Sequence, residues 1–162
     1  MSQRILFVSR RNSLRSVLAQ ACLMHIGRGQ FAAESCGQPG FISDTVHPAA
    51  IAALNHARIP VPAQAPRSWA EFSRSGARRM DFVVTLDERA MSSEPGWPGQ
   101  PITALWAFED AAALEDPNAA GHAAMQILFA LQRRLELLIN LPFHHVDSGA
   151  LRSDLRDLGR MS

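Results

Sequence analysis

Three arginines stand close together near the start of the chain, in the segment Ser9-Arg10-Arg11-Asn12-Ser13-Leu14-Arg15-Ser16. This segment follows an apolar run at 5–8 that is typical of a buried parallel strand, and a helical pattern begins directly after it. A turn between a strand and a helix directs successive backbone N–H groups and the positive helix end into one concavity. Arginine side chains add donors that match tetrahedral oxyanions. The spacing therefore favours a site for a phosphate-sized anion, and a solvated basic turn is the alternative that spacing alone leaves open.

The elements that would position this segment alternate between strands and helices. Short apolar runs predict strands at 5–8, 31–33, 82–86 and 102–105. Helices are predicted from about 17 to Gly27, from Pro48 to about Ala57, from about Ser68 to Arg78, and from Pro117 or later to Pro142. We therefore predict a three-layer α/β fold with a four-stranded parallel sheet flanked by helices. Ligands of such sheets bind beyond the carboxyl ends of the strands.

Length, composition and charge exclude several classes of protein. The chain has 162 residues, of which 47% are apolar and 19% charged, as expected of one globular domain. Its 16 basic residues, all arginine, nearly balance 15 acidic ones, so no bulk attraction to nucleic acid is expected. No apolar run approaches the roughly 20 residues that span a bilayer, and the sequence predicts a cytoplasmic protein without membrane contact. Because Cys22 and Cys36 lack paired spacing and His144-His145 lacks further ligands, we expect neither a metal nor a cofactor.

The loop segment resembles the signature of a known family. A strand, a loop of pattern C-x5-R-S and a helix characterise the low-molecular-weight protein tyrosine phosphatases and the related thioredoxin-coupled arsenate reductases. Their loop usually reads V-C-x-G-N-x-C-R-S, whereas residues 8–16 here read V-S-R-R-N-S-L-R-S. Other similar segments lie at 34–37, 46–48, 67–72, 80–86 and 105–110. The resemblance implies a flavodoxin-like fold of the phosphotyrosine protein phosphatase I type over 1–141, with 142–162 as a C-terminal extension.

The resemblance also implies roles for individual residues. In the family, a thiolate at the first loop position attacks phosphorus or arsenic, and an aspartic acid protonates the leaving group. The nucleophile position falls on Ser9, the oxyanion arginine on Arg15, and the general acid on Asp110. Asp116 is the alternative acid, because the proline that usually follows the acid comes after Asp116. The residues expected to bind the anion are Arg10, Arg11, Asn12 (which would shape the loop), Ser13, Leu14, Arg15 and Ser16.

This chain departs from the family's pattern at every sulfur position. A helix N-terminus can lower a thiol pKa from about 8.5 to roughly 3.5–7.5, but the same shift leaves the Ser9 hydroxyl protonated. Asp87 and Glu94 stand where the arsenate reductases have the two further cysteines of their redox relay. Arg11 replaces a loop glycine, so either the backbone changes its path there or a long side chain leans over the anion pocket.

These departures predict binding without turnover, as in a pseudophosphatase. The expected ligand is phosphate, sulfate, an arsenate-like oxyanion or a phosphorylated protein. A residually active phosphomonoesterase, using Asp110 and either water or Ser9, is the alternative, and an arsenate reductase is less favoured. An interaction module acting through Trp97 and the C-terminal tail is a further hypothesis. In that tail, Asp147-Ser148 can cap a helix whose leucines would dock on their own domain or on a second copy in a homodimer.

Overall fold

The computed structural model describes residues 2–143 and 148–161, and its centre is a four-stranded parallel sheet. The strand order is β2-β1-β3-β4, with β1 at Gln3–Ser9, β2 at Phe31–Gly37, β3 at Phe82–Thr85 and β4 at Ile102–Leu105. All four predicted strands are present. The strand β2 extends beyond the predicted 31–33, because it pairs with β1 from Gln3↔Phe31 to Ser9↔Gly37. Its second half carries Glu34 and Ser35, which an apolar run does not include.

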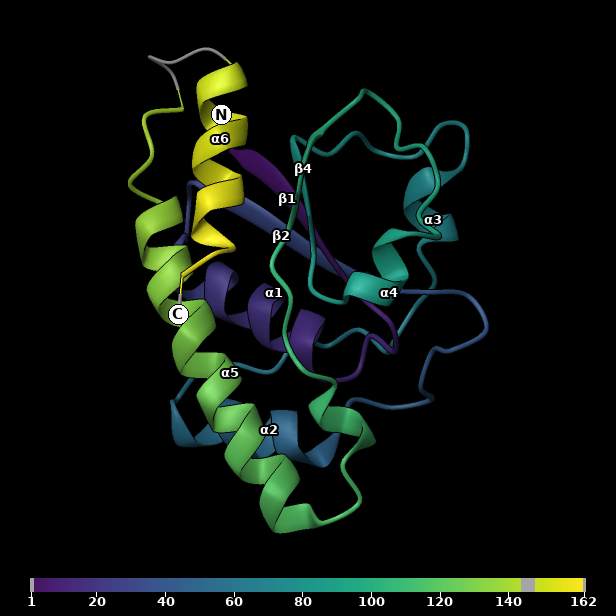
Figure 1. Ribbon diagram of the computed structural model, residues 1–162, viewed down its shortest axis with the longest axis vertical. Coiled ribbons are helices and arrows are strands. Elements are labelled where there is room, and N and C mark those ends of the chain that lie inside the picture. The colour runs from purple at the N-terminus through teal and green to yellow at the C-terminus, as the bar shows by residue number, and fades with distance from the viewer. Residues whose placement is uncertain (1, 144–147, 162) are drawn as a thin grey trace.

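Helices cover both faces of this sheet (Figure 1). On one side of the sheet lie α1 (Arg15–Ile26), α5 (Pro117–Leu138) and α6 (Ser148–Leu158), and α2 (Pro48–His56) packs against α1 and α5. The other face packs against the short helices α3 (Ala70–Ser73) and α4 (Glu88–Met91). The predicted three-layer α/β class with a flavodoxin-like arrangement is therefore confirmed. Within the described ranges, no helix is both long enough and apolar enough to cross a membrane.

Two helix starts follow directly from the sequence. Pro48 and Pro117 occupy the first turn of α2 and α5, where a missing N–H costs nothing. The preceding residues supply the caps: His47 Nδ1 accepts from Ala49 N at 3.0 Å, and an Asp116 carboxylate oxygen accepts from the amide of Asn118 at 3.2 Å. The long helix therefore begins at the first of the positions that the sequence allowed.

The helix predicted from Ser68 to Arg78 is wrong in length, because α3 has only one turn. Ser68 does cap it, since its Oγ accepts from Ala70 N at 3.0 Å. Arg74 then adopts an extended conformation, and Gly76 has a φ of +83°, so the chain cannot continue as a helix. Two further short elements were not predicted, namely α4 and the 3₁₀ turn at Ala111–Ala113.

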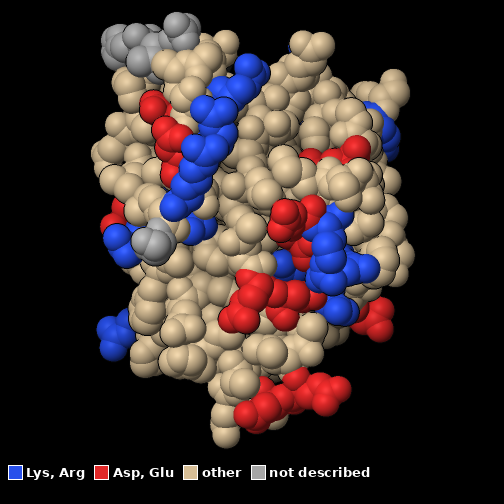
Figure 2. Space-filling model, in the orientation of Figure 1, with Lys and Arg blue, Asp and Glu red and all other residues tan. Residues whose placement is uncertain are grey.

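The C-terminal helix α6 lies on its own domain, beside α5 and over β4 (Figure 1). Its residues Leu151, Leu155 and Leu158 are buried, as predicted for its apolar face. The predicted cap Asp147 falls outside the described residues. On α6, Arg152 and Arg156 are exposed. Figure 2 shows a stripe of basic side chains in the region where Figure 1 places this helix.

Candidate functional site

The loop at 9–16 joins the carboxyl end of β1 to the start of α1, and Asn12 fixes its shape. Asn12 has a φ of +51°, a left-handed conformation that asparagine adopts more readily than most residues. Its buried side chain donates from Nδ2 to Ser16 Oγ at 2.9 Å and to Ser35 Oγ at 3.0 Å. Its Oδ1 accepts from Arg67 N at 2.9 Å. The loop is thereby attached to β2 and to the segment that precedes α3.

The loop uses three of its carbonyl groups for structure and leaves the amide groups of residues 13–16 free. The carbonyl oxygens of Arg10, Arg11 and Ser13 accept from the amides of Gln38, Ser43 and His47 at 3.0, 3.1 and 2.9 Å. In contrast, the backbone N–H groups of residues 13–16 donate to no acceptor among the described residues. Gly37 permits this packing, because a Cβ there would lie 3.0 Å from Asn12 Cβ and 3.1 Å from Arg10 O. The result is a row of unused donors, which is what an oxyanion requires.

Ser9 lies at the base of the loop with only 2% of its surface exposed. Its Oγ shares a hydrogen bond of 2.7 Å with Ser16 Oγ and accepts from Asn12 N at 3.2 Å. Neither partner is a base that could take up the Ser9 proton at neutral pH. The bonds continue from Asn12 through Ser35 Oγ to Gln20 Oε1, which lies 2.6 Å from that hydroxyl. The hydroxyl of Ser9 is thus part of a buried structural network.

Arg15, the expected oxyanion arginine, is 3% exposed and already holds two carboxylates. Its Nη2 lies 2.9 Å from Asp87 Oδ2 and 3.4 Å from Asp110 Oδ1. Its Nη1 donates to the carbonyls of Phe108 at 3.0 Å and Leu86 at 3.4 Å. These partners follow β3 and β4. Because the strands are parallel, the carboxyl ends of β1, β3 and β4 lie on the same side of the sheet. The protein itself therefore supplies acceptors to the arginine that would otherwise hold an external anion.

Two further arginines complete the charge cluster around these carboxylates. Arg11 Nε lies 3.1 Å from Asp110 Oδ2, so the long side chain does lean over the site. Arg89 Nη2 lies 3.4 Å from Asp87 Oδ2 and 3.6 Å from Asp110 Oδ2. Figure 2 shows basic and acidic side chains interleaved on this face, around a cleft of about 300 Å³. Arg89 was not predicted, although its place just after a predicted strand was a signal that could have indicated it.

The Asp87 carboxylate remains ionised in this cluster. Burial acts to raise its pKa, but the Arg15 charge and hydrogen bonds from Arg15, Ala90 and Arg89 act against burial. The net effect holds the pKa of Asp87 below its ordinary value of 3.8. With Arg11 and Arg89 included, the cluster contains three cations and two aspartates. Because Glu88 and Glu109 also line the cleft, these three cations face four carboxylates, and no surplus of positive charge remains there for a further anion.

Arg10 and Ser13 are loop residues with buried polar atoms that lack a partner among the described residues. The guanidinium carbon of Arg10 lies 3.8 Å from the ring centre of Phe41, so this side chain stacks on an exposed aromatic ring. Arg10 Nε and Ser13 Oγ are nevertheless buried without a hydrogen-bond partner in the part of the chain that the structure describes. Unpaired buried donors are rare, and two of them in one loop are compatible with a ligand at this place.

The structure separates the two candidate acids. Asp110 belongs to the charge cluster, with its side chain 11% exposed. Asp116 is exposed and caps α5. Only Asp110 lies beside the loop arginines, and its role as an acid stays a prediction.

The positions that would carry sulfur in an arsenate reductase have structural partners. Asp87 caps α4, since its Oδ1 accepts from Arg89 N at 2.8 Å and from Ala90 N at 3.2 Å. Glu94 accepts from Thr85 Oγ1 and, at 3.1 Å, from Trp97 Nε1. Burial raises the pKa of Glu94 above its ordinary 4.5, although both of these hydrogen bonds act to lower it. Trp97 also packs edge-on against Trp69, with 6.5 Å between ring centres, so loop packing accounts for this tryptophan without a partner.

The two cysteines lie in separate hydrophobic cores on opposite faces of the sheet. Burial, together with the charge of Glu136, raises the pKa of the Cys22 thiol to about 12. Burial also raises the pKa of Cys36 well above 9.0. Both are therefore small buried apolar residues, as expected. His144 and His145, the weak metal candidates, fall outside the described residues, and within the described ones no cluster of metal-ligating side chains is found.

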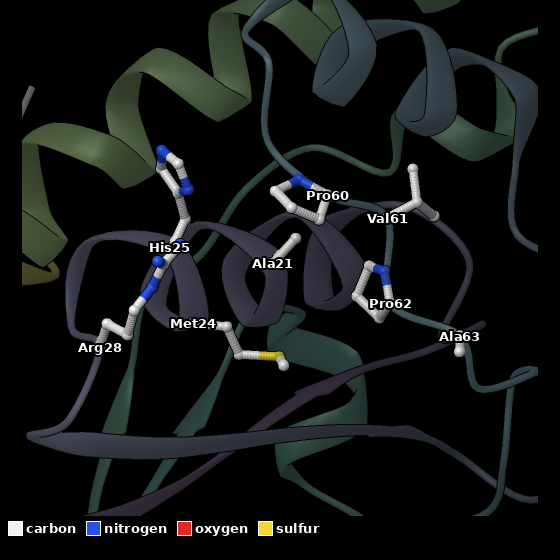
Figure 3. Close-up of a pocket in the computed structure, with 8 residues that line it drawn as sticks. All are labelled: Ala21, Met24, His25, Arg28, Pro60, Val61, Pro62 and Ala63. Atoms are coloured by element: carbon white, nitrogen blue, oxygen red, sulfur yellow. The ribbon is translucent and has the colours of Figure 1, made fainter.

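A second cleft, of about 330 Å³, lies between the C-terminal half of α1 and residues 60–63 (Figure 3). Apolar side chains dominate it: in Figure 3, Met24 points toward Pro62 across the groove. This cleft shares no residue with the loop at 9–16. The charged cleft beside Arg15 is therefore the candidate site, since its lining includes Arg15 of the loop and the acidic segments at 87–88 and 109–110.

Comparison with known proteins gives consistent matches. The sequence model described as low molecular weight phosphotyrosine protein phosphatase matches residues 4–144. A glutaredoxin arsenate reductase from Synechocystis sp. is 32% identical over 108 residues, which is 67% of this chain and 78% of that protein. A solved arsenate reductase in the phosphate binding state has a TM-score of 0.66 at 29% identity, with 85% and 96% of the two chains covered. An arsenate reductase from Archaeoglobus fulgidus shares the fold, with a TM-score of 0.65, 23% identity and coverage of 85% and 99%.

The fold and the loop define an α/β protein with a strand–loop–helix segment whose free amides lie at the carboxyl ends of the strands. Because the match extends over most of its length, the chain belongs to the low molecular weight phosphotyrosine protein phosphatase family. The proteins that this chain resembles include arsenate reductases as well as phosphatases.

Proposed function

We propose that this protein binds a phosphate-type oxyanion, free or on a phosphorylated partner, at the 9–16 loop without turning it over. One contrast carries the proposal. The amides at 13–16 are free to bind an anion, whereas the Ser9 hydroxyl beneath them is held by hydrogen bonds and has no base to activate it. The free amides and the unpaired Ser13 Oγ favour binding. The reductase relative that is described in a phosphate binding state supports the same ligand class.

Two features argue against turnover. Ser9 has no base among its hydrogen-bond partners, so its oxygen is a poor nucleophile. Arg15 is engaged by Asp87 and Asp110, so it would stabilise a transition state only after releasing them. Both carboxylates also compete with the ligand, and we expect the native chain to bind phosphate only weakly.

Two enzymatic functions compete with this proposal. A phosphomonoesterase would use Asp110 as the acid and water or Ser9 as the nucleophile. An arsenate reductase is favoured by the names of the relatives, but it would need thiols from another molecule, because Cys22 and Cys36 are buried on opposite faces. Each activity has its own assay, so the alternatives are separable.

The experiment is isothermal titration of the purified chain with inorganic phosphate, and then with a phosphotyrosine peptide, at low salt. Asp87→Asn should bind phosphate about tenfold more tightly than the native chain, because it removes a charged competitor for Arg15 and keeps an amide that can cap α4. Asp157→Asn, an exposed change on α6, is the matched control and should leave the affinity unchanged.

Parallel assays with a fluorogenic phosphate ester, and with arsenate plus glutathione and glutaredoxin, should show no turnover by the native chain. Sustained turnover in either assay would replace the proposal by that activity. Absence of saturable binding by both the native chain and Asp87→Asn would reject oxyanion binding itself.

A further inference from the structure

The C-terminal helix α6 contacts β4 and Trp106, at the start of the segment that carries Asp110. Residues 145–162 lie beyond the family match, so α6 is an addition to the matched domain. It packs over β4, where Trp106, fully buried, donates from Nε1 to Leu155 O at 2.9 Å. Gly159 approaches so closely that a Cβ there would lie 2.4 Å from Leu105 O and 2.6 Å from Trp106 Cδ1. The start of the acidic segment is thus fixed by the added helix.

Arg134 on α5 forms a second connection between the same parts. It is only 7% exposed, and its Nη2 donates to Met161 O at 2.6 Å. Its guanidinium carbon lies 4.5 Å from the ring centre of Phe108. Its Nη1 has no hydrogen-bond partner among the described residues, and burial lowers the pKa of the group. A cation that is buried at such cost is held here by the tail on one side and by the Phe108 ring on the other.

Phe108 connects this arrangement to the anion loop. Its carbonyl oxygen accepts from Arg15 Nη1 at 3.0 Å, and Asp110, two residues later, lies 3.4 Å from Arg15 Nη2. A continuous set of contacts therefore runs from α6 and Met161 through Arg134 and Phe108 to Arg15.

From these contacts we infer that the C-terminal extension restrains oxyanion binding, with Arg134 as the positioning residue that keeps Phe108 and Asp110 against Arg15. The inference rests on the proposed function, because it concerns how anion binding at the same loop is regulated. While the tail is docked, the Phe108 carbonyl accepts from Arg15 Nη1, and the Asp110 carboxylate lies at ion-pair distance from Nη2. When the tail is displaced, the segment loses its support. Asp87 and the Leu86 carbonyl then still hold Arg15, but with two partners fewer it can turn more easily toward an anion in the loop.

Two variants of the full chain test this inference. Arg134→Met removes the charge and the hydrogen bond to Met161. Gly159→Ala forces the end of α6 away from β4 and leaves residue 134 as arginine. Arg133→Met, an exposed neighbour on α5, is the matched control. Arg134→Lys, which keeps a donor and a charge, should restore part of the native behaviour. Each folded variant is measured by hydrogen exchange of residues 105–114 and by titration with inorganic phosphate.

We expect faster exchange at 105–114 and phosphate affinity that rises about 2- to 30-fold in both test variants, the range typical of coupling between sites. Unchanged exchange at 105–114, or faster exchange with unchanged or weaker phosphate binding, would overturn the inference. If Arg134→Met does not fold, Gly159→Ala and Arg134→Lys decide alone. If no chain binds phosphate, Asp87→Asn included, the proposed function fails and the regulatory role fails with it, whereas the exchange data still show whether the tail holds the segment.

Discussion

The two sides of the candidate site differ in how much of the family's pattern they keep. On one side, the 9–16 loop keeps its asparagine, its arginine and a row of free amides. On the other side, the segments after β3 and β4 place Asp87 and Asp110 beside Arg15. Glu94 stands where the resemblance to arsenate reductases would place a relay cysteine. The comparison teaches that the loop after β1 can keep its groups for holding an anion while the segments after β3 and β4 change, because different strand ends supply the two sides.

The largest effect is expected from restoring sulfur to the loop. If only the nucleophile is missing there, Ser9→Cys should raise hydrolysis of a fluorogenic phosphate ester by about 100-fold or more, since loss of a nucleophile can cost about 10⁶ in rate. Ser9→Ala is the control and should stay inactive. A silent Ser9→Cys chain, even when combined with Arg11→Gly, would show that the loop side has been rebuilt as well, and the contrast between the two sides would disappear.

The loop side should also depend strongly on Asn12. Asn12→Ala removes three hydrogen bonds, two of them buried, and places alanine at a φ of +51°, so we expect the free energy of unfolding in urea to fall by about 2–4 kcal/mol. Asn55→Ala on the exposed surface of α2 should change it by less than about 0.5 kcal/mol. Equal effects of the two substitutions would contradict the structural role that we give to Asn12.

The acidic side should respond to pH through Asp87. Its pKa is lower in the folded chain than in the unfolded one, so its ionised form stabilises the fold above pH 3.8, and this stabilisation is lost as the pH falls through the lowered pKa. Urea unfolding should therefore show a stability difference between the native chain and Asp87→Asn that is constant near neutral pH and shrinks in acid. A difference that does not change between pH 6 and acid would show that Arg15 does not stabilise this carboxylate.

The smallest effect is expected at Glu94, whose pKa is raised by burial. A raised pKa means that the fold favours the protonated form, so stability is lost as the pH rises through 4.5 and the folded value. Glu94→Gln should therefore unfold about 1–3 °C above the native chain at pH 7 and at the same temperature below pH 4. A lower midpoint at pH 7 would show that the ionised carboxylate is needed by Thr85 and Trp97.

Local patterns in the sequence predict most of the fold and the loop. Apolar runs locate the strands, Pro48 and Pro117 locate helix starts, and the leucines of α6 locate its buried face. The helix at 68–78 fails because the capping signal at Ser68 describes only a helix start. What stops the helix is an extended Arg74 and the positive φ of Gly76, neither of which the capping pattern contains.

The charge cluster was not predicted as a cluster, because its members are distant in sequence. The sequence places Asp87 where the arsenate reductases have a cysteine, and it indicates Asp110 as a candidate acid. Nothing in the local sequence of either residue shows that both contact Arg15. The partnership of Arg134 with Phe108 is equally non-local. Such pairs follow from the order of strands in the sheet and from the docking of α6, which only the assembled chain specifies.

The burial of both native thiols has a practical consequence for chemical labelling. Cys22 and Cys36 have no exposed surface and hold their protons well beyond neutral pH. A maleimide or iodoacetamide reagent at pH 7 would therefore modify only a cysteine introduced at position 9, provided that reagent can enter the loop. Protection of that single thiol by added phosphate would then measure occupancy of the loop directly, with no background to subtract.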